Sequence, residues 1–229
     1  MKKTKFMLGA LVLSMGLLGT GYALWTDTLA VNATVDTGKL DIKFENLKNV
    51  DNYKNNIQSG VDGKYTTFNS TATLAEGPAS GDYDNTDDQI DITIKEMVPG
   101  ASTKVTARMV NNGTVAARLA KITPQVNATT DAELQKELNV EIKVYDTDWV
   151  PVVIYNGTLK DLLAKKEVNL TKDVLGRDIL FVPGKADDDI QLEINVKISE
   201  NATNEIQEKD ASFTIDFGFE QTFEPIINK

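Results

Sequence analysis

The chain has 229 residues, with 24 Lys and Arg against 34 Asp and Glu, a net charge of -10, and neither cysteine nor histidine. Without these two residue types it has no disulfide, no thiolate or imidazole metal ligand and no Cys-His or Ser-His nucleophile system. The acidic balance excludes nucleic-acid binding, which needs clustered Lys and Arg. The sequence therefore predicts no catalytic residue, no metal and no cofactor.

Residues 1–23 have the three parts of a secretory signal peptide. Three lysines within the first five residues precede an apolar run, and Gly21 and Ala23 are the small residues that a signal peptidase reads. The alternative is a permanent membrane anchor, but the run is shorter than the roughly 20 residues that a bilayer requires. We expect cleavage between Ala23 and Leu24, membrane contact only before cleavage, and secretion to the extracellular matrix or the cell surface.

Residues 24–36, which follow the cleavage site, have the pattern of an amphipathic strand. One face, interrupted by Asp27, carries Trp25, Leu29, Val31, Ala33 and Val35. Such a strand can pair within its own sheet, or it can add to the sheet edge of a neighbouring molecule. The pattern alone favours pairing within the molecule, because terminal strands are ordinarily tied into their own sheet.

Alternation of apolar and polar residues dominates residues 37–229, which we expect to form a single domain. It is clearest at residues 40–44, 90–94, 105–109, 140–144, 190–198 and 213–219. Val-Pro-Gly at 98–100 and 182–184 suits type II turns, and Asn-Gly at 112–113 and 156–157 tolerates positive φ. About eight antiparallel strands joined by such turns predict an all-β fold, a jelly-roll-type antiparallel β-sandwich with short helical insertions.

Two short segments have helical patterns and one long segment has none. Residues 131–138 fit a short helix, and residues 158–166 fit another with Thr158 as its N-cap. Residues 46–88 are rich in Asn, Gly, Ser, Thr and Asp. They are predicted to form a long loop, with at most a short strand near residues 65–74.

Acidic clusters are the only candidates for a cation site. They lie at residues 82–91, 146–148 and 187–189. An EF-hand loop that began at Asp82 would need Gly and Glu where the chain has Asp87 and Thr93, so the motif fails. Solvated turns explain such clusters in an acidic chain, and we predict no metal site from them.

Three stretches, taken in order, carry a family resemblance. The first joins the end of the signal peptide to the start of the mature chain, at residues 19–27 and 33–42. The second is the Pro-Gly turn at 97–100, followed by a strand and the Asn-Gly turn at 110–114. The third is the closing pair of strands, at 191–199 and 212–222. Together they resemble the TasA, camelysin and CalY family of secreted proteins that form biofilm-matrix fibres.

The resemblance implies a jelly-roll subunit that is exported through a dedicated signal peptidase and assembles by donor-strand exchange. In this mode the mature N-terminal strand fills a groove in the next subunit. Residues 24–36 would be the donor strand. Its buried anchors would be Trp25, Leu29, Val31, Ala33 and Val35. The implied partners are further copies of the chain and an accessory or anchoring matrix protein.

Two alternatives come from other functional classes. Camelysin relatives have been described as metalloproteases, but a zinc protease relies on imidazole ligands and this chain has no histidine. We therefore expect no enzyme activity. The second alternative is a monomeric surface adhesin or carbohydrate-binding β-sandwich, which would use the loops around Tyr145 to Tyr155 or the acidic loop.

Overall fold

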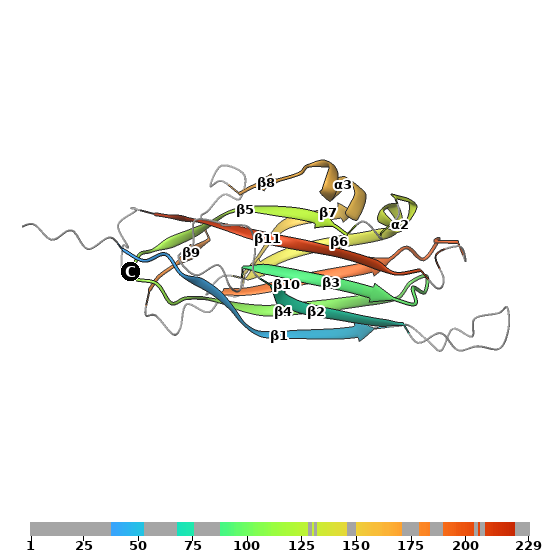
Figure 1. The fold of residues 1–229 in the computed structure, drawn as a ribbon, viewed down its shortest axis with the longest axis horizontal. Helices are drawn as coiled ribbons and strands as arrows, with labels where there is room; N and C mark the ends of the chain where they lie inside the picture. The colour runs from blue at the N-terminus through green and yellow to red at the C-terminus, as the bar shows by residue number, and fades with distance from the viewer. Residues whose placement is uncertain are drawn as a thin grey trace, which may run out of the picture. The chain divides into compact units, whose positions relative to one another are not determined.

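The described residues build two antiparallel β-sheets that pack face to face, with two short helices at one side (Figure 1). The predicted β-sandwich is thereby confirmed. The computed structural model describes residues 38–52, 68–75, 88–127, 130, 132–145, 150–170, 179–183, 190–203, 206 and 209–222. All of them belong to one compact unit that begins at Gly38.

Sheet A has five strands in the order β1-β4-β10-β6-β7. Their bounds are β1 (Ile42–Asn52), β4 (Ser102–Asn111), β10 (Ile190–Ile198), β6 (Leu138–Tyr145) and β7 (Pro151–Thr158). Along β4, β6 and β10 buried residues alternate with more exposed ones. This is the period-two pattern of the sequence, and it gives the sheet one inner and one outer face.

Sheet B has the order β2-β3-β11-β5-β8, and β9 pairs with another part of β5. The bounds are β2 (Asn69–Ala75), β3 (Gln89–Lys95), β11 (Ala211–Gln221), β5 (Ala117–Val126), β8 (Val168–Asn169) and β9 (Leu180–Phe181). The two long central strands of this sheet are β11 and β5, and they pair over almost their whole length.

The strand pairs are nested as in one long hairpin that has been rolled up. In sheet B, β3 pairs with β11 and β5 pairs with β8; in sheet A, β4 pairs with β10 and β6 pairs with β7. This nesting is that of a jelly roll, so the predicted topology is confirmed. Strands β1 and β2 extend the two sheets, β1 beside β4 and β2 beside β3.

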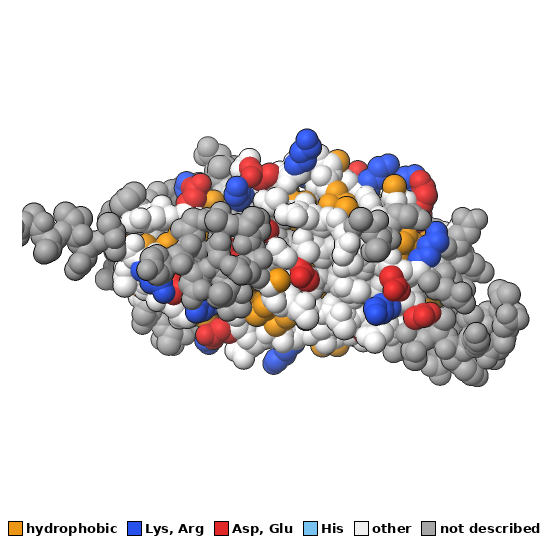
Figure 2. All heavy atoms as spheres, in the orientation of Figure 1, with side chains coloured by type: hydrophobic (Ala, Val, Ile, Leu, Met, Phe, Trp, Pro, Cys, Tyr) orange, Lys and Arg blue, Asp and Glu red, His pale blue; other side chains and the backbone are white. Residues whose placement is uncertain are grey.

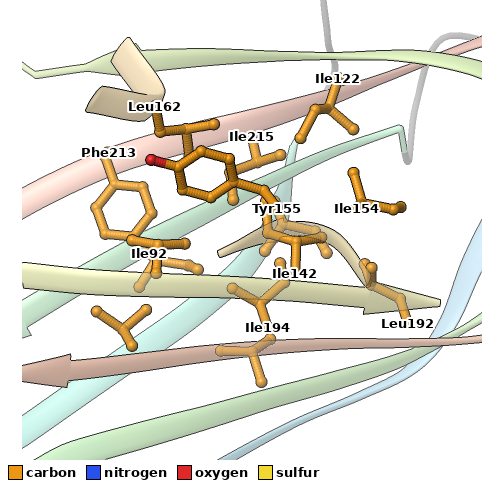
Figure 3. Close-up of a cluster of buried hydrophobic side chains, with 14 of the residues drawn as sticks. Ile92, Ile122, Ile142, Ile154, Tyr155, Leu162, Leu192, Ile194, Phe213 and Ile215 are labelled. Carbon is orange, nitrogen blue, oxygen red and sulfur yellow. The ribbon is translucent and has the colours of Figure 1, made fainter. Parts of the chain in front are cut away.

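The core lies between the inner faces of the two sheets (Figure 3). Ile92 and Phe213 of sheet B lie opposite Ile142 and Ile194 of sheet A, and all four side chains are completely buried. Burying an isoleucine or phenylalanine side chain contributes about 1.5–3 kcal/mol. A core of this kind explains how a chain without disulfides holds two sheets together.

Two helices, α2 (Ala132–Glu137) and α3 (Leu159–Ala164), occupy the predicted positions. Thr158 Oγ1 accepts a hydrogen bond from the Asp161 backbone N–H at 3.1 Å, as expected of an N-cap. Leu159 and Leu162 are fully buried. The amphipathic pattern of this segment therefore reflects its packing onto the sandwich.

The predicted start of the long loop, at residue 46, is wrong, because β1 continues to Asn52. A register shift between Glu45 and Lys48, together with a positive φ at Asn46, marks a bulge in the strand. The bulge interrupts the period-two pattern and so hides the second half of β1 in the sequence. The expected short strand is confirmed as β2, and residues 53–67 and 76–87 lie outside the described residues.

The two kinds of predicted turn have different outcomes. Gly100 has a φ of 80°, and the Ala101 N–H donates to Val98 O at 3.0 Å, as a type II turn requires. The Asn156-Gly157 turn is wrong, because both residues lie inside β7. A Cβ at Gly157 would lie 2.6 Å from Tyr155 Oη, so glycine is needed here for close approach and not for a turn.

Candidate interaction surfaces

The site residues that the sequence predicts lie outside the described residues. These are Gly21, Ala23 and Leu24 at the cleavage site, and Trp25, Leu29, Val31, Ala33 and Val35 in the donor strand. In the described part, no group of three or more acidic side chains lies together as metal ligands would. The helices of that part are too short or too polar to cross a membrane. The described unit can show which surfaces could receive a strand or a ligand.

Strand β7 forms one edge of sheet A and carries no charge. Residues 150–159 contain neither Lys, Arg, Asp nor Glu, although charged residues make up 25% of the chain. Val150 and Val153 are 48% and 49% exposed. Among the described residues no strand pairs with the outer side of β7. An exposed, uncharged edge rich in β-branched residues is a template for an incoming strand.

Strand β1 forms the other edge of sheet A and is protected. It contains Lys43, Glu45, Lys48 and Asp51, and the bulge after Glu45 interrupts its ladder. Glu45 accepts a hydrogen bond from Arg108 at 2.6 Å across the sheet. Charges and bulges both discourage strand addition. Strand β7 also has a bulge, at Ile154, so charge is the feature that separates the two edges of sheet A.

Side-chain hydrogen bonds tie β1 to β2 across the two sheets. Asn49 Nδ2 donates to Ser70 O at 2.8 Å, and Asp51 Oδ2 accepts from the Ser70 N–H at 3.0 Å. Thr103 Oγ1 of β4 donates to Asn49 Oδ1 at 2.6 Å. These contacts close the β1–β2 side of the sandwich. Figure 1 places β1 at the side opposite the two helices.

The outer face of sheet A contains a hollow of about 330 Å³. We call it the sheet A hollow. The side chains that shape it include Asn139, Asn156, Asn195, Glu141, Lys104 and Lys197. They come from β4, β10, β6 and β7, which are neighbours in the sheet. The volume is at the low end of the range for small-molecule sites, which begins near 300 Å³.

Glu141 is the centre of the hydrogen bonds in the sheet A hollow. It accepts from Lys143 at 2.6 Å, from Asn195 at 3.3 Å and from Asn156 at 3.5 Å. The hydrogen bond that Lys143 donates to Glu141 outweighs burial and raises the pKa of Lys143. Burial opposes ionisation of Glu193, but hydrogen bonds from Asn195 and Lys104 hold its pKa below the usual value. These groups are therefore charged at neutral pH, and they fix the amides in place.

The outer face of sheet B is polar but mostly uncharged. Thr71, Thr93, Ser212 and Thr214 lie on it, and Thr93 Oγ1 and Ser212 Oγ are 3.1 Å apart. In Figure 2, the Lys, Arg, Asp and Glu side chains seen on the coloured part of the molecule are scattered.

Asp216 of β11 is a buried carboxylate in sheet B. It is 4% exposed, and its Oδ1 has no hydrogen-bond partner. Burial and the charge of nearby Asp88 raise its pKa to about 6, although Lys121 acts in the opposite direction. The ionised form of Asp216 is therefore unfavourable in the folded protein.

Comparison with known proteins identifies no family. No family model matches the chain, and no curated protein does. Among solved structures, the enzymatically active domain of tailspike protein 4 from bacteriophage CBA120 aligns with 78% of this chain at 12% identity, with a TM-score of 0.30. The alignment spans 20% of the tailspike chain. A similarity of this size carries no argument about function.

Sequence reasoning missed both the β7 edge and the sheet A hollow. A signal for the edge was present, because residues 150–159 are uncharged in an otherwise charged chain. A signal for the hollow was also present in the asparagines within apolar alternating segments, at Asn139 and Asn195. Their convergence depends on strand order, which the sequence does not reveal.

Proposed function

We propose that the chain is a secreted structural subunit that polymerises into extracellular biofilm-matrix fibres by donor-strand exchange. The observation that carries the proposal is the β7 edge, an uncharged strand with exposed Val150 and Val153. The amphipathic segment 24–36 supplies a strand for it. The resemblance to the TasA, camelysin and CalY family and the jelly-roll topology support the same function.

The donor strand of one copy adds beside β7 of the next copy. Backbone hydrogen bonds hold it in the sheet, and its apolar face, which carries Trp25, Leu29 and Val31, packs beside partly buried Val152. Apolar burial contributes about 25 cal/mol per Å². In this arrangement each copy gives one donor strand and accepts one at β7, so the contact is head-to-tail and generates an open filament.

Net charge explains why the contact forms at this edge. The chain carries -10, and removal of the three lysines in residues 1–23 leaves the mature chain at -13, so copies repel one another at most orientations. An uncharged strand is where a second copy can approach at least electrostatic cost. Cleavage by a dedicated signal peptidase starts assembly, because residues 24–36 are tethered to the membrane until residues 1–23 are removed. An accessory matrix protein anchors the fibre.

Electron microscopy of two matched double variants tests the proposal. Leu29→Asp with Val31→Asp places two charges on the apolar face of the donor strand, and we expect it to abolish filaments. Thr28→Asp with Ala30→Asp places the same charges in the same segment on the opposite face, and we expect filaments to persist. The two variants have equal charge and length, and both retain the cleavage site.

Filaments from the Leu29→Asp, Val31→Asp variant at the rate of the unaltered chain would contradict the proposal. So would equal loss in both variants, because the apolar face would then have no special part in assembly. The secreted, soluble fraction of each variant must be purified first, so that a failure of export is not mistaken for a failure of assembly.

A further inference from the structure

Three asparagines lie in strands of sheet A, although asparagine has a low intrinsic propensity for β-strands. Asn139, Asn156 and Asn195 lie within β6, β7 and β10. Asparagine is depleted in strands, and threonine would provide a polar side chain with better strand propensity. All three side chains meet at the sheet A hollow. Residues that oppose local preference and converge on one place indicate a functional requirement.

The asparagine side chains present hydrogen-bonding groups to the hollow. The amide nitrogen of Asn195 donates to Glu193 at 2.8 Å and to Glu141 at 3.3 Å, which orients this amide, and the amide nitrogen of Asn156 donates to Glu141 at 3.5 Å. The described residues supply no donor to their Oδ1 oxygen atoms, and they supply no partner to the Asn139 amide. The Oδ1 atoms of Asn156 and Asn195 can accept from hydroxyl groups, and the Asn139 amide can both accept and donate. The hollow is therefore matched to a ligand with several neighbouring hydroxyl groups.

The charges around the hollow are paired. Lys104 contacts Glu193 at 3.0 Å, Lys197 contacts Glu200 at 2.9 Å, and Lys143 contacts Glu141 at 2.6 Å. Glu141 and Glu193 would repel an anionic ligand, and the lysines would repel a cationic one. The alkyl stems of Lys104 and Lys197 offer the apolar surface that a sugar ring requires. A neutral, hydroxyl-rich ligand fits this balance.

We propose that the sheet A hollow binds a neutral oligosaccharide segment of a polysaccharide. The site is complete in one copy of the chain, so this function goes beyond fibre assembly and does not depend on it. Since the hollow is small and open, binding by one copy is weak, with a dissociation constant of about 1 mM. In a fibre, many hollows would act on one polysaccharide, and avidity would strengthen the attachment.

Saturation-transfer NMR with the full chain and three tetrasaccharides tests the proposal. The probes are tetramers of β-linked glucose, of β-linked N-acetylglucosamine and of galacturonic acid, each at about 10 mM. We expect transfer to at least one of the two neutral tetramers and none to the acidic one. The glucose and N-acetylglucosamine arms distinguish a plain hexose polymer from an amino-sugar polymer.

Two variants separate binding from folding. Asn139→Thr with Asn156→Thr removes two amides, and we expect at least a tenfold weaker affinity for the neutral tetramer with an unchanged or higher melting temperature, because threonine is the better strand former. Asn69→Thr is the matched control. It makes the same kind of exchange at an exposed strand position in sheet B that does not line the hollow, and it should bind as the unaltered chain does.

Four outcomes overturn the proposal. They are no transfer to either neutral tetramer, transfer to the acidic tetramer alone, unaltered binding by the Asn139→Thr, Asn156→Thr variant, and an equal loss of binding in the Asn69→Thr control. None of them bears on filament formation, which is scored separately by electron microscopy.

Discussion

The two edge strands of sheet A have matched exposed valines but unlike surroundings. Val50 of β1 is 52% exposed and Val153 of β7 is 49% exposed, and both lie on the outer face of the sheet. Both strands have a bulge, after Glu45 in β1 and at Ile154 in β7, but around Val50 the strand carries charges, whereas around Val153 it carries neither Lys, Arg, Asp nor Glu. In the proposed assembly, the charges along an edge are what separates an edge that accepts a strand from one that does not.

The largest expected effect is on fibre growth when charge is placed on β7. Val153→Lys puts an ammonium group on the acceptor edge, which discourages strand addition. We expect elongation to fall to an undetectable rate, followed by light scattering and electron microscopy. Val50→Lys makes the same exchange on β1, and we expect growth at the unaltered rate.

The reverse result would contradict the assignment of β7 as the acceptor edge and β1 as the protected edge. If Val50→Lys stopped growth and Val153→Lys did not, β1 would be the acceptor edge. Circular dichroism of both variants must first show an intact fold. Both valines are about half exposed, so neither exchange creates a buried charge.

The buried carboxyl group of Asp216 makes the stability of the fold depend on pH. This effect has to be measured separately from strand addition at the edges of sheet A. Its pKa is raised to about 6 in the folded protein, against about 4 when unfolded, so the folded state binds the proton more tightly. The contribution of Asp216 to stability is therefore greatest below about pH 4 and falls by about 3 kcal/mol as the pH rises from about 4 to about 6. Urea unfolding at a series of pH values measures this.

Asp216→Asn is the control for that pH effect. It removes the titrating group while keeping the shape of the side chain, and we expect the decline in stability between pH 4 and 6 to shrink. An undiminished decline in stability would show that another carboxylate is responsible.

A smaller effect is expected for Gly157→Ala, which alters packing beneath β7. The added Cβ would lie 2.6 Å from Tyr155 Oη, which donates to Thr158 O at 2.7 Å. The ring has to move, and overpacking of this kind costs about 1–3 kcal/mol. Thermal unfolding measures the loss. A variant as stable as the unaltered chain would show that Tyr155 can shift without cost.

The smallest effect is expected for Glu45→Gln on β1. Glu45 and Arg108 form an ion pair at 2.6 Å, but the two side chains are 41% and 36% exposed. A pair at the surface contributes less than about 1 kcal/mol. We expect a barely measurable fall in melting temperature. A large fall would show that the charges of β1 stabilise the fold as well as protecting the edge.

The layers of the sandwich could be predicted because its central strands obey a simple rule. In β10 every second residue from Ile190 to Ile198 is buried, and the same alternation is present in the sequence. The helix after Thr158 was predictable for a similar reason, since its cap lies within one turn of the residue that it contacts. Local periodicity and local hydrogen bonds are properties of short segments.

The features that could not be predicted from the sequence depend on contacts between residues that lie far apart in the chain. The second half of β1 was hidden because its polar inner residues, Asn49 and Asp51, meet Ser70 across the sandwich. Asn156-Gly157 resembled a turn, whereas the glycine accommodates the Tyr155 ring. The sheet A hollow combines residues from all five strands of sheet A. The predicted donor strand lies outside the described residues and stays a prediction.

Side-chain hydrogen bonds close the β1–β2 side of the unit, whereas the β7 side is open. The two sides are therefore different, and a fibre built from such units is polar. In a fibre built as proposed, one end always presents an unfilled β7 edge, and the other presents a free donor strand. The two ends of every fragment are then chemically different, so a broken fibre yields one new end of each kind. A ligand that covers β7 would halt growth at a single end and leave the opposite end active.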